Sequence, residues 1–313
     1  MTVLPKSIGI IETGPRDGLQ SEAIGLTPAM RAGLVQDLFA CGLEHVQAVS
    51  FVSPKRVPQM AGADEVLRRL DEKDRRRCSA LVLNEKGLDL ALAAGIRQVD
   101  LSISTSDRHS RKNTGMSLAE AEPALIRMID RAHSAGLRVR AGLQNVFGCR
   151  EAGQPQAELL RRLIRRLAGS GVAQISLADS SGMGWPALIE RVTRELREAA
   201  GPDLPFILHL HDTRGLAMAN IMAGMASGVR LFDASVGGTG GCPFIRDAAG
   251  NPATEDLVAL CDSSGIRTGV DAEKLARCAT RLGEMLQRQL PGRYHRLRAA
   301  GVKPSFFKGE GSP

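Results

Sequence analysis

Aromatic side chains are scarce in this 313-residue chain: they make up 3% of it, with one Trp and one Tyr. Proteins that bind single-stranded nucleic acids stack bases on aromatic rings, so the sequence offers little material for that mode of binding. The net charge of +7 could still attract polyanions. No RNP, helix-turn-helix or zinc-finger pattern accompanies it. We therefore expect no nucleic-acid partner, and we expect the charge to serve small anionic ligands or to be solvated.

Cysteine pairs and long apolar runs are also absent. The cysteines are scattered, with no CxxC pair, so neither a disulfide framework nor a zinc cluster is indicated. No stretch approaches the roughly 18 uninterrupted apolar residues that a membrane span needs. The first ten residues show neither the apolar core of a signal peptide nor the Arg/Ser run of a transit peptide. We expect a cytoplasmic protein without a membrane partner, in which any functional cysteine acts singly.

Short apolar or β-branched runs alternate with amphipathic helical segments along the chain. The eight runs lie at 7–14, 45–51, 77–83, 98–104, 138–145, 173–179, 205–211 and 230–237. Such alternation implies parallel strands with right-handed crossovers, and eight units close most simply into a TIM barrel. We predict an α/β protein with a (β/α)8 barrel as catalytic domain over 1–290 and a short C-terminal extension, a partly ordered tail, over 291–313. A doubly wound sheet is the alternative.

Two helical segments have clear amino-terminal signals. Thr27-Pro28 combines a preferred N-cap residue with proline at the first helical position. Ser117 and Glu120 have the spacing of a capping box, and Gly136 marks the end of the same helix. Pro123 lies inside that helix and removes a backbone donor there, so we expect it to bend the helix or to move its start downstream.

The seventh run ends in two histidines separated by one residue, His209 and His211. Side chains alternate along a strand, so both histidines point to the same face. In TIM barrels the chemistry gathers at the carboxyl ends of the strands, where two imidazoles can bind one metal ion. The alternative is a pair of core histidines, which would be costly to bury without polar partners. The pattern favours metal binding.

Two glycine-containing loops follow the first and the eighth runs. The first, at 12–18, places Arg16 beside Asp17 where glycines let a ligand approach the backbone. A surface ion pair is the alternative for that segment. The second, at 237–243, is dense in glycine and carries Cys242. Nine residues after Cys242, the side-chain carbonyl of Asn251 could complete a metal site.

The proposed metal ligands combine imidazole with oxygen donors. They are Asp17, His209, His211 and Asn251. This donor set suits Mg²⁺, Mn²⁺, Co²⁺ or Zn²⁺, and ligand type alone does not choose among these ions.

Four segments carry a resemblance to a known family. They read GPRDGLQ (14–20), SFVSPKRVPQM (50–60), HLHDT (209–213) and GGCPF…GNPATEDLV (240–258). From about residue 8 to about 290 the chain resembles 3-hydroxy-3-methylglutaryl-CoA lyases, TIM-barrel enzymes that depend on a divalent metal. The loop at 235–244 is similar to their cysteine signature. The resemblance implies a cation, Mg²⁺ or Mn²⁺ first, on the four ligands above.

The resemblance also implies an activity. The family cleaves a 3-hydroxy-3-substituted acyl-CoA to acetyl-CoA and a 3-oxo acid such as acetoacetate, a reaction of leucine degradation. Arg16 would bind substrate and stabilise the enolate oxygen, and Cys242 would donate a proton to the enolate. Asp17 or a histidine near the metal, such as His209, would be the base. Gln20 and Asp179 match family positions that line the substrate site.

One departure from the family concerns its second strand, where a glutamate is replaced by Gln47. An amide keeps the size and an acceptor but carries no charge. Either activity on methylglutaryl-CoA is therefore reduced, or the substrate is a relative, such as citramalyl-CoA or a longer branched 3-hydroxyacyl-CoA. A non-catalytic acyl-CoA-binding relative is the other alternative. Claisen-condensing synthases share the metal ligands but resemble HxHND at the seventh strand, so HLHDT favours the lyase.

Three further expectations concern partners and single residues. Lys55, Arg111 and Lys112 follow strands and offer cations for the coenzyme A phosphates. Cys149 is expected to be a buried structural residue. The chain is expected to form a homo-oligomer, a dimer as the first choice.

Overall fold

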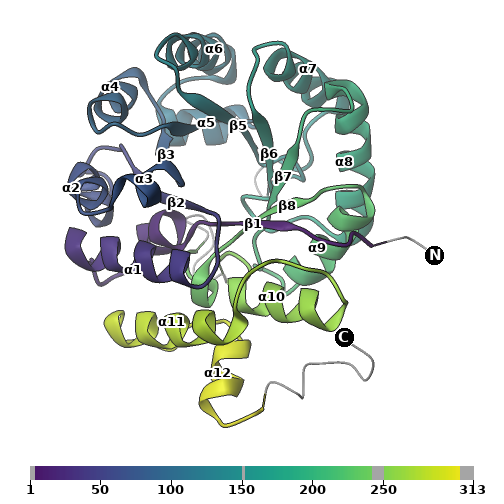
Figure 1. The fold of residues 1–313 in the computed structure, drawn as a ribbon. Helices are drawn as coiled ribbons and strands as arrows, with labels where there is room; N and C mark the ends of the chain where they lie inside the picture. The colour runs from purple at the N-terminus through teal and green to yellow at the C-terminus, as the bar shows by residue number, and fades with distance from the viewer. Residues whose placement is uncertain (1–3, 150–151, 242–249, 304–313) are drawn as a thin grey trace.

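The computed structural model describes residues 4–149, 152–241 and 250–303 and has the predicted barrel architecture. Eight parallel strands form a closed sheet in chain order, and β8 pairs with β1 (Figure 1). The strands are β1 (Gly9–Glu12), β2 (His45–Ser50), β3 (Cys78–Val82), β4 (Gln98–Ser104), β5 (Arg138–Gln144), β6 (Gln174–Ala178), β7 (Phe206–His209) and β8 (Leu231–Ala234). Each strand lies within one predicted run. The (β/α)8 prediction is confirmed, and the doubly wound alternative is wrong.

Helices surround the barrel on its outer face (Figure 1). They are α1 (Pro28–Ala40), α2 (Ala63–Arg68), α3 (Glu72–Arg76), α4 (Glu85–Ala93), α5 (Asp107–Thr114), α6 (Leu118–Ser134), α7 (Ala157–Ala168), α8 (Pro186–Ala200), α9 (Ala217–Ala226), α10 (Thr254–Ser263), α11 (Ala272–Met285) and α12 (Tyr294–Ala299). Apolar faces of most of these helices pack against the strands in one continuous core, to which α3, α5 and α12 contribute no residue.

The helix signals in the sequence are borne out with one correction. The Thr27 side chain accepts a hydrogen bond of 3.3 Å from the backbone N–H of Met30. Ser117 and Glu120 form the complete capping box at the start of α6. Pro123 does not move that start downstream, because α6 already begins at Leu118. The capping box stabilises the first turn, so the missing proline donor is tolerated inside the helix.

The strands have an apolar outer face and a polar inner face. In β4, for example, Val99 and Leu101 are fully buried in the hydrophobic core, whereas the alternating residue Asp100 hydrogen-bonds to residues of β2 and β3. In β5, Arg140 makes an ion pair with Asp233 of β8 across the barrel. Alternation along a strand produces this division. The barrel interior therefore consists largely of hydrogen-bonded polar groups beneath the site.

Glu12 links β1 to the segments that follow β8. Its carboxylate accepts hydrogen bonds from the N–H of Gly14 (2.7 Å), the N–H of Val236 (2.9 Å) and the hydroxyl of Thr254 (2.6 Å). Burial raises the pKa of the Glu12 carboxyl to about 7, although these hydrogen bonds act in the opposite direction. The buried Glu12 side chain thus joins the loop after β1, at Gly14, to the segments before and after the glycine-rich loop, at Val236 and Thr254.

The predicted boundary at 290 is not a structural break. Beyond it, α12 packs on α10 and α11, and His295 Nδ1 lies 2.7 Å from a buried carboxylate oxygen of Glu255. Tyr294 donates a hydrogen bond of 2.7 Å to Glu273. Residues 291–303 are therefore part of the packed domain. Among the described residues, no helix combines the length and the apolar character that a membrane span requires.

Candidate active site

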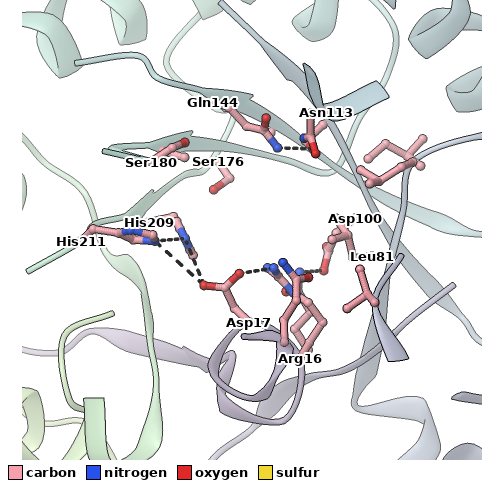
Figure 2. Close-up of a pocket in the computed structure, with 18 of the residues that line it drawn as sticks. Arg16, Asp17, Leu81, Asp100, Asn113, Gln144, Ser176, Ser180, His209 and His211 are labelled. Carbon is pink, nitrogen blue, oxygen red and sulfur yellow. Dashed lines mark hydrogen bonds and ion pairs between the residues drawn. The ribbon is translucent and has the colours of Figure 1, made fainter. Parts of the chain in front are cut away.

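A cavity of about 320 Å³ opens at the carboxyl ends of the strands. Six side chains to which the sequence pointed line it: Arg16, Asp17, Gln20, Gln47, His209 and His211. Figure 2 shows Asp17 between the two histidines on one side and Arg16 on the other. The first and the seventh strands, far apart in the sequence, thus bring their polar ends into one site.

The loop after β1 places Arg16 and Asp17 through a single π-helical turn, Gly14–Gly18. The N–H groups of residues 16, 17 and 18 all point to the carbonyl oxygen of Thr13, at 3.1, 2.7 and 3.2 Å. Single π-turns are rare and are frequent at functional sites. Gly18 is required because a Cβ atom there would overlap the side chain of Thr239. The GPRDG segment therefore directs both charged side chains into the cavity.

The two histidines converge as the alternation rule predicted, although β7 itself ends at His209 rather than at 211. The last ladder pairs on both sides of β7 involve His209, so the following residues have no strand to join. The Nε2 atoms of His209 and His211 nevertheless lie 3.2 Å apart, and each lies 3.9 Å from Asp17 Oδ2. On the other edge of its ring, His209 Nδ1 lies 2.9 Å from Asp233 Oδ2. Asp233 thereby fixes the ring so that Nε2 faces the site.

Electrostatics keep these donors in the forms that bind a metal ion. Burial alone would raise the pKa of the Asp17 carboxyl, but Arg16 and the two imidazoles outweigh it and hold that pKa well below its usual range. Burial and the neighbouring His209 lower the pKa of His211 to about 4. At neutral pH the site thus presents a carboxylate and a neutral His211 imidazole, as metal binding requires.

The geometry of the three donors fits a divalent cation. In the plane of Asp17 Oδ2 and the two Nε2 atoms, the point equidistant from all three lies about 2.1 Å from each, a usual metal–nitrogen and metal–oxygen distance for Zn²⁺ or Mg²⁺. Asn251 donates a hydrogen bond of 2.8 Å to Asp17 Oδ2, and its own Oδ1 is buried without a hydrogen-bond partner among the described residues. A buried unsatisfied oxygen is costly and is available as a further ligand.

Arg16 lies at the end of a buried chain of polar groups. Its guanidinium makes an ion pair with Asp17 and donates through Nε to the side-chain oxygen of Gln47. The Gln47 amide in turn donates to Oδ2 of Asp100, which also accepts a hydrogen bond of 2.7 Å from Ser79. The residue that departs from the family therefore connects the site to a second carboxylate.

Several lining residues were not found from the sequence. They are Arg56, Asp100, His109, Asn113, Arg140 and Gln144. A usable signal existed for two of them: Asp100 and Arg140 are charged residues within otherwise apolar strand runs, QVDLSIS and RVRAGLQ. Charges in such runs are costly to bury unless they are paired. Arg56, rather than its neighbour Lys55, is the basic side chain of the second-strand loop that lines the cavity.

Asp179 directly follows β6, at the start of the next loop. Its carboxylate accepts hydrogen bonds of 2.9 Å from the N–H groups of Met183 and Gly184, and burial raises its pKa to about 6. The side chain is fully buried and does not line the cavity, whereas its neighbour Ser180 does. Asp179 therefore shapes the loop after β6, and its expected part at the substrate site, as a supporting residue that orients neighbouring groups, stays a prediction.

The expectations for the two cysteines and for the three basic residues that follow strands have different outcomes. Cys242 lies outside the described residues. Cys149 is only partly buried, and its backbone pairs with Gly153, so the expectation of a buried residue was wrong. Lys55, Arg111 and Lys112 are exposed and do not line the cavity, and Arg111 pairs with Asp107 on its own helix.

Comparisons with known proteins agree on one family. The HMGL-like family model matches residues 7–281. A hydroxymethylglutaryl-CoA lyase of Pseudomonas mevalonii is 42% identical over 284 residues, which cover 90% of this chain and 93% of that protein. An (R)-citramalyl-CoA lyase of Chloroflexus aurantiacus is 38% identical over 296 residues, with 91% and 93% covered.

A solved structure gives the same result at the level of the fold. It is an HMG-CoA lyase of Acinetobacter baumannii in complex with coenzyme A and 3-methylmalate. It superposes with a TM-score of 0.88 at 31% identity and covers 96% of this chain and 97% of that chain. The match therefore extends over nearly the whole length of both chains.

Proposed function

The chain belongs to the HMGL-like family, and from that membership we propose that it is a carbon–carbon lyase cleaving 3-hydroxy-3-methylglutaryl-CoA to acetyl-CoA and acetoacetate. The observation that supports this most is the adjacency of two different devices in one cavity. A three-donor cluster that fits a divalent cation lies directly beside Arg16, a permanent cation. Retro-Claisen cleavage needs both, because charge develops at the two ends of the breaking bond.

The cation would be held by Asp17, His209, His211 and Asn251. When bound, it supplies Lewis-acid chemistry by lowering the pKa of a coordinated hydroxyl and fixing the orientation of its carbon. Mg²⁺ and Mn²⁺ are our first choices, and Co²⁺ and Zn²⁺ suit the same donors. The chain's own contribution is to keep Asp17 and His211 deprotonated and to hold the ring of His209 in its orientation through Asp233.

Arg16 would stabilise the oxygen of the thioester enolate. The residue is 8% exposed, and its guanidinium is held from two sides, by Asp17 and by Gln47. A donor oriented in advance and shielded from water contributes typically about 3 to 4 kcal/mol to such a transition state. Cys242 would then give the proton that converts the enolate into acetyl-CoA, as the family resemblance implies.

The group that accepts the hydroxyl proton is Asp17 or a histidine of the site. The lowered pKa of Asp17 makes its carboxylate a weak base. His209 lies with Nδ1 against Asp233, so the one ring nitrogen that could take the proton is Nε2, which is also the atom that it offers to the metal. The substrate enters as a coenzyme A thioester, and Arg56 on the cavity wall offers a cation for it in addition to the exposed Lys55 and Lys112.

A second substrate is supported by one of the relatives. The citramalyl-CoA lyase is 38% identical to this chain, close to the 42% of the hydroxymethylglutaryl-CoA lyase. Part of the cavity wall is also polar, formed by Ser102, Gln144, Ser176 and Ser180 together with Asn113. Citramalyl-CoA and longer branched 3-hydroxyacyl-CoA thioesters are therefore the alternatives to be compared directly.

The test is the release of acetyl-CoA by the purified protein. The substrates are 3-hydroxy-3-methylglutaryl-CoA, both enantiomers of citramalyl-CoA and a longer branched analogue, each with Mg²⁺, with Mn²⁺ and with EDTA. We expect cleavage of at least one thioester that EDTA abolishes and added metal restores. Cleavage that EDTA leaves unchanged would contradict the metal assignment. Binding of the thioesters without any cleavage would instead support a non-catalytic acyl-CoA-binding relative.

Two finer predictions accompany this function. We expect a homodimer in solution, which light scattering of the purified chain measures directly. We also keep the expectation of a cytoplasmic location, which fractionation of cells that express the protein tests.

A further inference from the structure

The environment of Gln47 connects the catalytic arginine to a carboxylate that the family resemblance does not point to. Gln47 on β2 is 2% exposed, and Asp100 on β4 is 4% exposed. The Gln47 amide lies between Arg16 and Asp100: it accepts a hydrogen bond from Arg16 Nε and donates one to Asp100 Oδ2. Three buried side chains from three parts of the barrel thus form one hydrogen-bonded row.

The row has a fixed direction. A guanidinium only donates hydrogen bonds, and an ionised carboxylate only accepts them. A glutamine between the two can satisfy both partners in one orientation, with its oxygen toward Arg16 and its NH₂ toward Asp100. Asp100 therefore decides which end of the Gln47 amide faces Arg16. Without a carboxylate at 100, the amide could turn its NH₂ group toward the guanidinium, and two donors would then oppose each other.

Asp100 has two other polar neighbours, Ser79 and Arg140. Ser79 donates a hydrogen bond of 2.7 Å to the same oxygen, Oδ2. The nearest guanidinium atom, Arg140 Nε, lies 4.0 Å from Oδ1, and Arg140 is already paired with Asp233. Oδ1 itself has no hydrogen-bond partner among the described residues. A buried carboxylate that is only half satisfied is costly to fold, which favours a role that outweighs the cost.

We propose that Asp100 is a positioning residue that holds Arg16 through Gln47 and supplies the negative charge that a glutamate at 47 would supply directly. This negative charge is on Asp100 of β4, so it is separated from Arg16 by the Gln47 side chain of β2. This proposal rests on the proposed lyase function, in which Arg16 stabilises the enolate. It makes the pair Gln47 and Asp100 a unit, so that neither residue can be changed alone without loss.

A charge swap between the two positions tests the unit. In Gln47→Glu, two carboxylates meet in a buried space and repel each other. In Asp100→Asn, the orientation of the Gln47 amide is no longer fixed. We expect each single variant to lose about 10- to 100-fold in kcat with a smaller change in KM, since a misplaced donor costs mainly transition-state stabilisation. The double variant Gln47→Glu/Asp100→Asn restores a carboxylate on Arg16 and an amide donor behind it, and we expect it to recover most of the wild-type kcat.

Recovery in the double variant separates positioning from a general loss of structure. Asp89→Asn is the matched control: it makes the same substitution at an exposed ion pair with Arg131 and should leave kcat unchanged. A double variant that loses the product of the two single losses, or an Asp100→Asn variant with wild-type kcat, would overturn the proposal.

Failure of the proposed function gives a different result. In that case the wild-type chain cleaves none of the thioesters, and calorimetric binding of acetyl-CoA becomes the readout. The same pattern is then expected in Kd, with both single variants weaker than wild type and the double variant restored. For a chain that cleaves none of the thioesters, equal Kd values for all four proteins would overturn the positioning role.

Discussion

The Nε2 atoms of His209 and His211 lie 3.2 Å apart, and both face the same carboxylate oxygen of Asp17. At this separation two N–H groups cannot point at each other, so at least one of the rings is deprotonated on that side. The lowered pKa of His211 keeps its ring neutral at pH 7. The two rings therefore already hold their Nε2 atoms in positions from which both could bind one cation.

Replacing His211 by alanine should remove metal content and activity together. The substitution deletes one of the three convergent donors, and we expect metal affinity to fall by at least about 100-fold, beyond the effect usual for residues that only support a ligand. Metal content after dialysis, measured by mass spectrometry beside kcat, tests this. A variant that keeps its metal but loses turnover would show that His211 acts in chemistry rather than as a ligand.

Cys242→Ser should separate the two properties. Cys242 is not among the proposed ligands, so metal content should remain at the wild-type level. Turnover should fall by about 100-fold or more, since general acid catalysis contributes typically 10²- to 10⁴-fold and serine is a far weaker acid than a thiol. Full activity of Cys242→Ser would show that the proton comes from another group.

The sequence predicted the fold because the fold depends on local signals. Eight apolar runs and the caps of α1 and α6 repeat along the chain, and right-handed crossovers leave few topologies. The histidine pair was also predictable, since alternation places 209 and 211 on one face. The sequence was less informative about side chains whose role depends on tertiary contacts. Asp179 ends its strand as a site residue would, but its carboxylate caps the N–H groups of the loop at 183 and 184.

The cross-barrel network was beyond sequence reasoning for a related reason. Gln47 and Asp100 are 53 positions apart, and their contact depends on the register of three adjacent strands. A buried charge in the run QVDLSIS indicates that a partner must exist, but it does not say which residue that is. Single-sequence patterns thus identify residues that need explaining, and the closed sheet supplies the explanation.

Gly250→Ala should weaken metal binding without changing any donor atom. A Cβ atom at 250 would overlap the backbone of Gly240, and the carbonyl of Gly250 accepts a hydrogen bond of 2.8 Å from the N–H of Asp212. The clash must displace the segment that carries Asn251. We expect metal affinity to fall by about 10-fold, in line with other changes that misplace a ligand, as measured by competition with a chelator.

The control for this substitution is Gly33→Ala. A Cβ atom at 33 meets nothing within 4 Å, and the position lies within α1. Alanine there should leave metal affinity unchanged and raise stability by up to about 1 kcal/mol, the difference in helix propensity. Equal metal affinity of Gly250→Ala and Gly33→Ala would mean that the approach of 250 to 240 does not control the site.

Glu12→Gln should change how stability depends on pH. Burial raises the native pKa of Glu12 from 4.5 to about 7, so between these values the native state binds more protons than the unfolded state. The contribution of this group to the free energy of unfolding is therefore complete below about pH 4.5 and declines as pH rises through 7, by about 3 kcal/mol in total.

In Glu12→Gln, the amide keeps the shape of the carboxyl group and one oxygen acceptor but cannot ionise. Relative to wild type, Glu12→Gln should gain stability between pH 5 and pH 8, measured by urea unfolding, whereas Glu198→Gln on the exposed face of α8 should not. Parallel pH profiles of wild type and Glu12→Gln would show that the three hydrogen bonds to the carboxylate, rather than its burial, dominate its ionisation.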